Sequence, residues 1–316
     1  MRAAVIAAAG IGDGLMMLVA AHRLFENGYQ VTLFQDTLPE LASWFPYCRF
    51  ANRTSLQNSL AKLDNYDLIV LQHDNRLLAQ TITTQARQKK LSVTITFYPF
   101  YDPARHLALT KRDFVFDQRK TMVENIAISI AAYLPGSRIA TDNGIAIPAD
   151  LHYRAERRLL IHPTSTAPER TWSKKKFISL AKKLRRRFDL VFCMHPKERA
   201  EWMALGVDPN QLPRFPTLSE LAAFVYESQG VIGNDSGVGH LASNLGIPTL
   251  IIAECAKHMA MWRPGWATTN VLTPPRWIPN TKGLRLRKKK WQAFISPHRV
   301  HQAILNNAVD LLRTTK

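Results

Sequence analysis

One stretch in the second half of the chain brings together several side chains that could do chemistry. The last six residues of "GNDSGVGH" (residues 233–240) offer an acid, a hydroxyl, two glycines and a histidine: Asp235, Ser236, Gly237, Gly239 and His240. If a helix starts here, its first backbone N–H groups lack partners and its dipole adds positive charge, so an anion such as phosphate is favoured. The structural alternative is that Asp235 or Ser236 caps the helix and the glycines ease the turn.

Three other segments place polar groups directly after apolar runs. They are residues 10–13 (GIGD), 162–170 (HPTSTAPER) and 193–198 (CMHPKE). Ligands of open α/β sheets bind at the carboxyl ends of the strands, so we expect these segments and residues 234–240 to share one ligand. Leu15 stands where a dinucleotide fingerprint needs its third glycine, and no P-loop pattern occurs, so a nicotinamide cofactor is not indicated.

Short apolar runs alternating with amphipathic segments indicate the elements that must position these groups. In the first half the expected strands cover residues 3–9, 29–35, 66–72 and 91–97, with a helix over 14–27. In the second half they cover 158–165, 189–196, 230–235 and 247–254, with a helix over 173–187 and another opened by a Thr217–Glu220 capping pattern. This βαβ rhythm predicts an α/β fold of two Rossmann-like, doubly wound parallel-sheet domains facing a central cleft.

The domain boundary is expected in residues 136–153, which are rich in turn formers and lack a clear period. We therefore predict domains of residues 1–150 and 151–316. Ser296 and Pro297 read as a cap followed by a first-turn proline. They begin a helix expected to run to about Arg313, which could pack back on the N-terminal domain.

Length and composition fit a two-domain chain without a membrane span. The chain has 316 residues, and no apolar run approaches the 18 residues that a spanning helix needs. We predict a cytoplasmic protein; the alternative is a secretory signal with Arg2 as its charged end. Cys48, Cys193 and Cys255 lie far apart, without zinc or disulfide spacing, and are expected to be buried reduced thiols.

The charge balance is the strongest compositional signal. Lys and Arg number 42 against 24 Asp and Glu, a net charge of +18, which implies an anionic partner such as nucleic acid, acidic lipid or phosphorylated glycan. The run at 182–187 reads as a solvated helix face. The run from Lys282 to Lys290 contains leucines and precedes Trp291, so we predict contact with an anionic membrane. The alternative is that it lies over the cleft and holds nucleotide phosphate.

Three ordered motifs resemble glycosyltransferase family 9, the lipopolysaccharide core heptosyltransferases with the GT-B fold. "DSGVGHLA" at 235–242 matches the family pattern D-[ST]-G-x-x-H-x-A, "IGD" at 11–13 stands where the family carries G-D, and "ERTW" at 169–172 resembles its [KR]-x-W segment. The resemblance implies a metal-independent, inverting transfer of a heptose from ADP-heptose. It implies an acceptor-binding N-terminal domain and a nucleotide-sugar-binding C-terminal domain.

The resemblance also implies roles for individual residues. Asp13 matches the family's proposed base, which takes the proton of the acceptor hydroxyl; its structural alternative is to cap the following helix. Arg170 is the candidate cation for the leaving diphosphate. His240 either donates to phosphate or is satisfied inside the helix, and Asp235 either meets sugar hydroxyls or orders its loop. The predicted donor-binding residues are Gly12, Ser165, Thr166, Glu198, Asp235, Ser236, Gly237 and His240, with Glu198 accepting the ribose hydroxyls and no residue binding metal.

Two departures from the family pattern bear on the donor. "HPKE" at 195–198 lacks the glycine common in the family, and "IIAECAKH" at 251–258 lacks its glycine-proline turn. The leading hypothesis is an enzyme that transfers heptose from an ADP-activated donor to an anionic inner-core glycolipid, peripherally at the inner face of the cytoplasmic membrane. The alternatives are a different nucleotide sugar on the same fold and a basic nucleic-acid-binding protein, which lacks a supporting motif.

Overall fold

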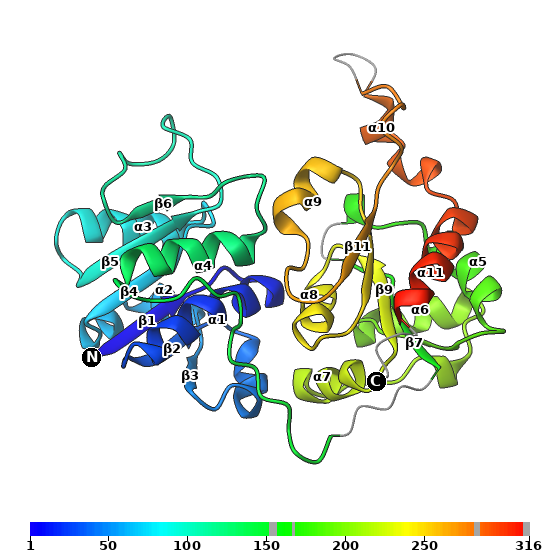
Figure 1. Cartoon of the computed structure of the whole chain (residues 1–316), viewed down its shortest axis with the longest axis horizontal. Coiled ribbons are helices and arrows are strands. Elements are labelled where there is room, and N and C mark those ends of the chain that lie inside the picture. The colour runs from blue at the N-terminus through cyan, green and yellow to red at the C-terminus, as the bar shows by residue number, and fades with distance from the viewer. Residues whose placement is uncertain (152–156, 166–167, 281–284, 312–316) are drawn as a thin grey trace. The chain divides into compact units, whose positions relative to one another are not determined.

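The structure is a computed structural model that describes residues 1–151, 157–165, 168–280 and 285–311. The chain divides into two compact units, Met1–Pro148 and Ala149–Lys316, and the division falls within the turn-rich segment 136–153 (Figure 1). Within the described residues, no helix is both long and apolar enough to cross a bilayer.

The N-terminal unit is a six-stranded parallel sheet covered by helices on both faces. The strands, in spatial order, are β3 (Cys48–Ala51), β2 (Gln30–Phe34), β1 (Arg2–Ile6), β4 (Leu68–Gln72), β5 (Val93–Tyr98) and β6 (Asp113–Val115). The helices are α1 (Ile11–Glu26), α2 (Thr54–Asn58), α3 (Leu77–Arg87) and α4 (Met122–Tyr133), with 3-10 turns η1 (Leu38–Trp44) and η2 (Leu60–Asn65). The apolar run of β1 is buried: Ala4 and Ile6 belong to a core that includes residues of α2 and α3, and α1 also contacts the strand.

The C-terminal unit is a five-stranded parallel sheet. Its strands, in spatial order, are β11 (Thr269–Leu272), β10 (Thr249–Ile252), β9 (Gly230–Asn234), β7 (Arg158–His162) and β8 (Asp189–Phe192). Its helices are α5 (Lys174–Leu184), α6 (Arg199–Ala204), α7 (Leu218–Tyr226), α8 (Gly237–Asn244), α9 (Ala256–Trp262), α10 (Leu286–Lys289) and α11 (Pro297–Leu311). Four 3-10 turns complete it: η3 (Pro168–Arg170), η4 (Pro196–Glu198), η5 (Pro209–Gln211) and η6 (Trp291–Phe294).

Both sheets reverse their winding direction beside their first strand. In the N-terminal unit β1 lies between β2 and β4, and in the C-terminal unit β7 lies between β8 and β9. Loops diverge at such a switch point and leave a crevice at the carboxyl ends of the strands, where ligands bind. The prediction of two doubly wound parallel-sheet units is confirmed.

Some local expectations were wrong. Helix α1 begins at Ile11 rather than at Gly14, because Gly10 is its N-cap in extended conformation and Gly12 is already helical. Cys48 and Cys193 are buried as expected, but Cys255 is exposed. Trp291, expected at a membrane interface, is only 3% exposed and belongs to the C-terminal core.

The last helix packs within its own unit. Val300 and Ile304 of α11 join the C-terminal core, and α11 contacts α5. The Thr217 hydroxyl caps α7 by accepting a hydrogen bond from the backbone N–H of Glu220, as the capping pattern predicted. Packing of α11 on the N-terminal unit stays a prediction.

Candidate functional site

The stretch at 233–240 forms a strand end, a sharp turn and a helix start, as expected. Strand β9 ends at Asn234, and α8 begins at Gly237 with Ser236 as its N-cap residue. The side chain of Ser236 makes no capping hydrogen bond, and its Oγ atom is buried without a partner among the described residues. The structural alternative, in which the Ser236 side chain caps the helix, is therefore wrong for this residue. A buried hydroxyl without a partner at a helix N-terminus suits an incoming anion.

Gly239 and His240 occupy the buried side of this helix. A Cβ atom on Gly239 would lie 2.7 Å from Cδ1 of Ile251, so this glycine permits α8 to pack closely on β10 rather than easing a turn. His240 is 5% exposed. Burial lowers the pKa of His240, against the raising effects of nearby Asp235 and of a hydrogen bond with the Trp262 backbone. Its Nδ1 atom has no partner among the described residues, so the neutral ring keeps one free polar position.

Asn234, which was not singled out from the sequence, joins three loops at this strand end. Its Nδ2 donates to the carbonyl of Pro163 at 2.7 Å, and its Oδ1 accepts from the backbone N–H of Trp172 at 2.9 Å. The side chain of Asn234 is fully buried. This residue therefore fixes the loop after β7 and the segment carrying Arg170 against the start of α8.

The segment carrying Arg170 is also braced from the C-terminal end of the chain. Trp291 Nε1 donates to the carbonyl of Glu169 at 3.0 Å, and Gln292 Nε2 donates to the carbonyl of Thr171 at 2.7 Å. A third bond runs in the opposite direction, from Trp172 Nε1 to the carbonyl of Ile295 at 3.1 Å. These bonds hold the backbone on both sides of Arg170, whose own side chain is exposed.

Arg170 and Asp235 line one pocket of about 670 Å³ in the C-terminal unit. The pocket lies at the carboxyl ends of β10 and β11, between α9 and the segment that carries α10. The other lining residues are Ala253, Glu254, Cys255, Ala256, Lys257, His258, Met259, Ala260, Thr273, Pro274, Arg276, Asn280, Arg287 and Lys288. His258 Nε2 lies 3.6 Å from Oδ2 of Asp235, so the Asp235 carboxylate helps to position the His258 side chain in the pocket. Polar and charged groups converge here at the edge where open α/β sheets bind ligands.

Ser165, Glu198, Gly237 and His240, also predicted to bind the donor, belong to the same unit and are not among the described residues that line the pocket. Gly237 and His240 lie on α8, directly after Asp235, and Ser165 follows β7. Thr166 lies outside the described residues. Glu198 lies in η4 beyond β8, where its Oε2 accepts from the backbone N–H of His195 at 3.3 Å. This bond gives Glu198 a local structural role, and its predicted contact with ribose stays a prediction.

In the N-terminal unit, Asp13 lies in the first turn of α1, after β1. Its Oδ1 accepts from Nε2 of Gln72 at 2.6 Å, and Gln72 Oε1 in turn accepts from the backbone N–H of Ala8 at 3.0 Å. Burial raises the pKa of Asp13, and nearby Asp74 adds to this; hydrogen bonds with Gln72 and the Gly10 backbone, and the charge of Arg76, lower it. Gly12 precedes Asp13 in the same turn and is buried. A partly buried carboxylate with a raised pKa suits proton abstraction.

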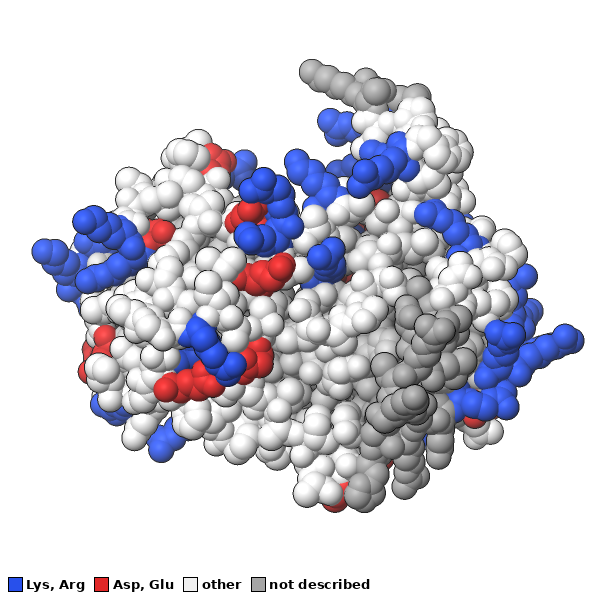
Figure 2. All heavy atoms as spheres, viewed as in Figure 1, with Lys and Arg blue, Asp and Glu red and all other residues white. Residues whose placement is uncertain are grey.

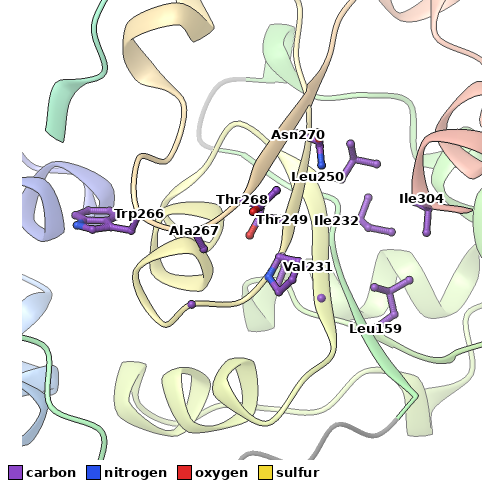
Figure 3. A pocket seen from close by; sticks show the side chains of 13 residues that line it. Leu159, Val231, Ile232, Thr249, Leu250, Trp266, Ala267, Thr268, Asn270 and Ile304 are labelled. Carbon is purple, nitrogen blue, oxygen red and sulfur yellow. The ribbon is translucent and has the colours of Figure 1, made fainter. Parts of the chain in front are cut away.

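A second pocket, of about 330 Å³, lies at the opposite edge of the C-terminal sheet. Gly230 and Thr249, the first residues of β9 and β10, line it, and Figure 3 shows Leu159, Ile232, Leu250 and Ile304 on its apolar side. None of the described residues that line it is Asp, Glu, Lys or Arg. It is therefore a poor site for a phosphate.

One group of side chains in the described part of the N-terminal unit has metal-ligating types within reach of one another: His22, Glu26 and Asp142. Buried Arg23 donates to both Glu26 and Asp142, and exposed Arg138 pairs with the same two acids. A cation would have to displace two guanidinium groups, so this donor set fits an ion-pair network better than a metal centre. The predicted absence of a metal requirement stays a prediction.

A comparison with models of protein families finds a match that covers both motif segments of the C-terminal unit. Residues 107–254 match the model of glycosyltransferase family 9 (heptosyltransferase), a segment that includes Arg170 and the Asp235–His240 stretch. The resemblance to glycosyltransferase family 9 is confirmed. No curated protein matches the chain.

Solved structures of heptosyltransferases share the fold of this chain. E. coli heptosyltransferase WaaC with ADP has a TM-score of 0.70 at 16% identity, covering 97% of this chain and 100% of WaaC. E. coli ADP-heptose lps heptosyltransferase II has a TM-score of 0.70 at 16% identity and covers 100% of both chains. The iron-containing dodecameric glycosyltransferase TibC of enterotoxigenic E. coli has a TM-score of 0.59 at 12% identity, covering 100% of this chain and 78% of TibC. The chain thus has the heptosyltransferase-like GT-B fold.

Proposed function

We propose that this protein is an inverting glycosyltransferase that moves a heptose from an ADP-activated donor to an inner-core lipopolysaccharide acceptor. One observation carries the proposal: Arg170 and Asp235, from two separate family motifs, line one pocket at the carboxyl ends of the C-terminal strands. The family match and the WaaC complex with ADP support a nucleotide donor. They favour glycosyl transfer over the nucleic-acid-binding alternative.

The donor diphosphate would bind between Arg170 and the start of α8. Negative charge grows on the diphosphate as the sugar–oxygen bond breaks, and fixed donors stabilise that charge without having to reorganise. Arg170 would supply a full positive charge from its braced segment. The unpartnered Ser236 Oγ and the first N–H groups of α8 would supply neutral donors. In this scheme the protein groups suffice for the leaving group, so no metal is required.

Asp13 would act as the base. As the acceptor hydroxyl attacks the anomeric carbon, its proton passes to the carboxylate, and the ADP leaves from the opposite side of the sugar, which inverts the configuration. Two donors, Gln72 Nε2 and the Gly10 backbone, hold the carboxylate. Burial raises its pKa, which makes the carboxylate a stronger base than an exposed aspartate.

Contact with an anionic membrane surface, at the inner face of the cytoplasmic membrane, is a further part of the proposal. Its support is the net charge of +18 and the basic run that ends at Lys290. Residues 282–284 of this run lie outside the described residues, and Trp291 is buried and does not contribute to a surface. Lys289 and Lys290 are exposed and lie outside the pocket lining, so we assign the membrane contact to them.

A thermal-stabilisation screen with nucleotide sugars tests the proposal. A ligand that binds only the folded state raises the melting temperature by mass action. We expect ADP-heptose and ADP to stabilise the protein more than UDP-, GDP- or CMP-sugars. Stabilisation by a different nucleotide would show that the donor is not ADP-heptose, but would still support a glycosyltransferase. The absence of stabilisation by any nucleotide at millimolar concentration would argue against the transferase itself.

A further inference from the structure

The pocket that holds Arg170 carries more positive charge than the family motifs account for. Five basic residues line it: Arg170, Lys257, Arg276, Arg287 and Lys288. Among the described residues that line it, two carry carboxylates, Asp235 and Glu254. Within the described part of the chain, none of the five cations forms an ion pair. Figure 2 shows Lys and Arg gathered near the base of the segment that carries α10. Such a surplus strongly favours an anionic ligand.

Three of these cations come from the C-terminal segment and are held in place there. Arg287 donates from Nη1 to the carbonyl of Arg276 at 3.0 Å, and its backbone N–H donates to the carbonyl of Pro279 at 3.1 Å. The backbone N–H of Lys288 donates to Oδ1 of Asn280 at 3.2 Å. Helix α10 is thereby fastened to residues 276–280, and the remaining N–H groups of Arg287 stay available to a ligand.

The same C-terminal segment fixes Arg170. The residues directly after α10 donate to the backbone on both sides of Arg170, through Trp291 to Glu169 and through Gln292 to Thr171. Arg170, Arg287 and Lys288 therefore line a single pocket, and the C-terminal segment that carries the last two is hydrogen-bonded to the backbone around the first. Because these backbones are already held, binding of an anion needs little further loss of loop entropy.

We propose that Arg276, Arg287 and Lys288, which line the same pocket as Arg170, form a subsite for the diphosphate of the nucleotide-sugar donor. This inference rests on the proposed function and assigns to it residues outside the family motifs. Arginine is suited to the role because its planar fork binds two phosphate oxygens at once. The basic run is thereby divided: Arg287 and Lys288 serve the donor pocket, whereas the adjacent Lys289 and Lys290 are exposed outside it.

The division supplies a matched pair of variants. Arg287→Gln/Lys288→Gln and Lys289→Gln/Lys290→Gln remove the same charge from the same short helix and its end, but only the first pair lines the pocket. Titration calorimetry would measure the binding of ADP and of adenosine to the parent and to both doubles. We expect the first double to bind ADP about tenfold or more weakly, with adenosine unchanged, and the second double to bind both ligands as the parent does. The loss should shrink as salt is raised.

The single variant Lys288→Gln tests the subsite with little risk of a folding defect, because the Lys288 side chain makes no hydrogen bond within the described structure. It should weaken ADP binding severalfold, while Lys289→Gln should not. ADP binding that is unchanged in the first double, or reduced equally in both doubles, would overturn the subsite. Loss of affinity for the acceptor alone, with ADP binding intact, would overturn it as well. If the parent itself binds no nucleotide, the proposed function fails and the subsite fails with it, a result distinct from all the others.

Discussion

Gln72 donates a 2.6 Å hydrogen bond from its Nε2 to Oδ1 of Asp13, although 59 residues separate the two in the chain. The orientation of the Gln72 amide is fixed, because its Oε1 accepts a hydrogen bond from the backbone N–H of Ala8 that a flipped amide would lose. Gln72 ends β4 and Asp13 follows β1, and these strands are neighbours in the sheet. The bond thus orients the carboxylate and partly offsets the rise in its pKa that burial causes.

Replacing Gln72 by Leu should therefore misplace the base and raise its pKa. We expect kcat to fall about ten- to a hundredfold, and the acidic limb of the kcat/KM profile to move to higher pH. A rate–pH series measures both. The control is Asn125→Leu, since Asn125 is also buried and hydrogen-bonded in the N-terminal unit, but to Asp117, Lys120 and Thr121. An unmoved acidic limb in Gln72→Leu would remove Gln72 from the role of positioning the base.

Asp13→Asn should lower the rate of transfer and raise the stability of the protein at neutral pH. Because its pKa in the folded state is raised, the ionised carboxylate destabilises the native protein at neutral pH. The stability cost should vanish below about pH 4, where the carboxyl is protonated in the unfolded chain as well. We expect transfer to fall at least a hundredfold, ADP affinity to stay unchanged, and the melting temperature to exceed that of the parent at pH 7 but not at pH 3.5. Full activity in this variant would show that Asp13 serves the fold alone.

Arg170→Gln should affect both binding and turnover. The cation meets phosphate in the ground state and meets more charge as the bond breaks, so ADP affinity should fall about tenfold and kcat about a hundredfold. Steady-state kinetics with ADP-heptose would separate the two effects. Arg185→Gln is the control, an exposed arginine at the end of α5 with the same change of charge. Kinetics equal to those of the control would place Arg170 outside the site.

Asn234→Ala should destabilise the C-terminal unit. The substitution leaves the buried N–H of Trp172 and the carbonyl of Pro163 without partners, which should lower the free energy of unfolding by about 2–4 kcal/mol. Denaturant titration measures the loss. Asn210→Ala, at an exposed turn, should change it by less than about 0.5 kcal/mol. Equal stability of the two variants would contradict the role of Asn234 in joining the loops.

Vesicle sedimentation tests the membrane contact. Neutralising Lys289 and Lys290 together should cost about 1 kcal/mol for each charge in binding to vesicles rich in phosphatidylglycerol. The difference from the parent should be largest at low salt, where screening is least. Neutral phosphatidylcholine vesicles are the control and should bind neither protein. If the double variant binds anionic vesicles as well as the parent at low salt, these lysines do not dock the protein.

Local patterns allowed the fold and the Asp235–His240 stretch to be predicted from the sequence. The βαβ rhythm is a property of successive residues, and the motif lies within one strand–turn–helix unit. Gln72 and Asn234 were missed because their roles depend on which strands become neighbours in the sheet, which no nearby residue indicates. Trp291 was wrongly expected at a membrane because leucines and lysines precede it, whereas tertiary packing buries it beneath the Arg170 segment.

The most direct test of the account is glycosyl transfer itself. The purified protein would be incubated with ADP-heptose and an inner-core lipopolysaccharide acceptor that lacks heptose, and the product analysed by mass spectrometry and by NMR of the anomeric centre. We expect ADP release, a product heavier by one heptose, and an anomeric configuration opposite to that of the donor. A product with retained configuration would contradict the displacement by an acceptor hydroxyl that Asp13 activates, and no transfer from ADP-heptose or any other nucleotide sugar would contradict the central claim.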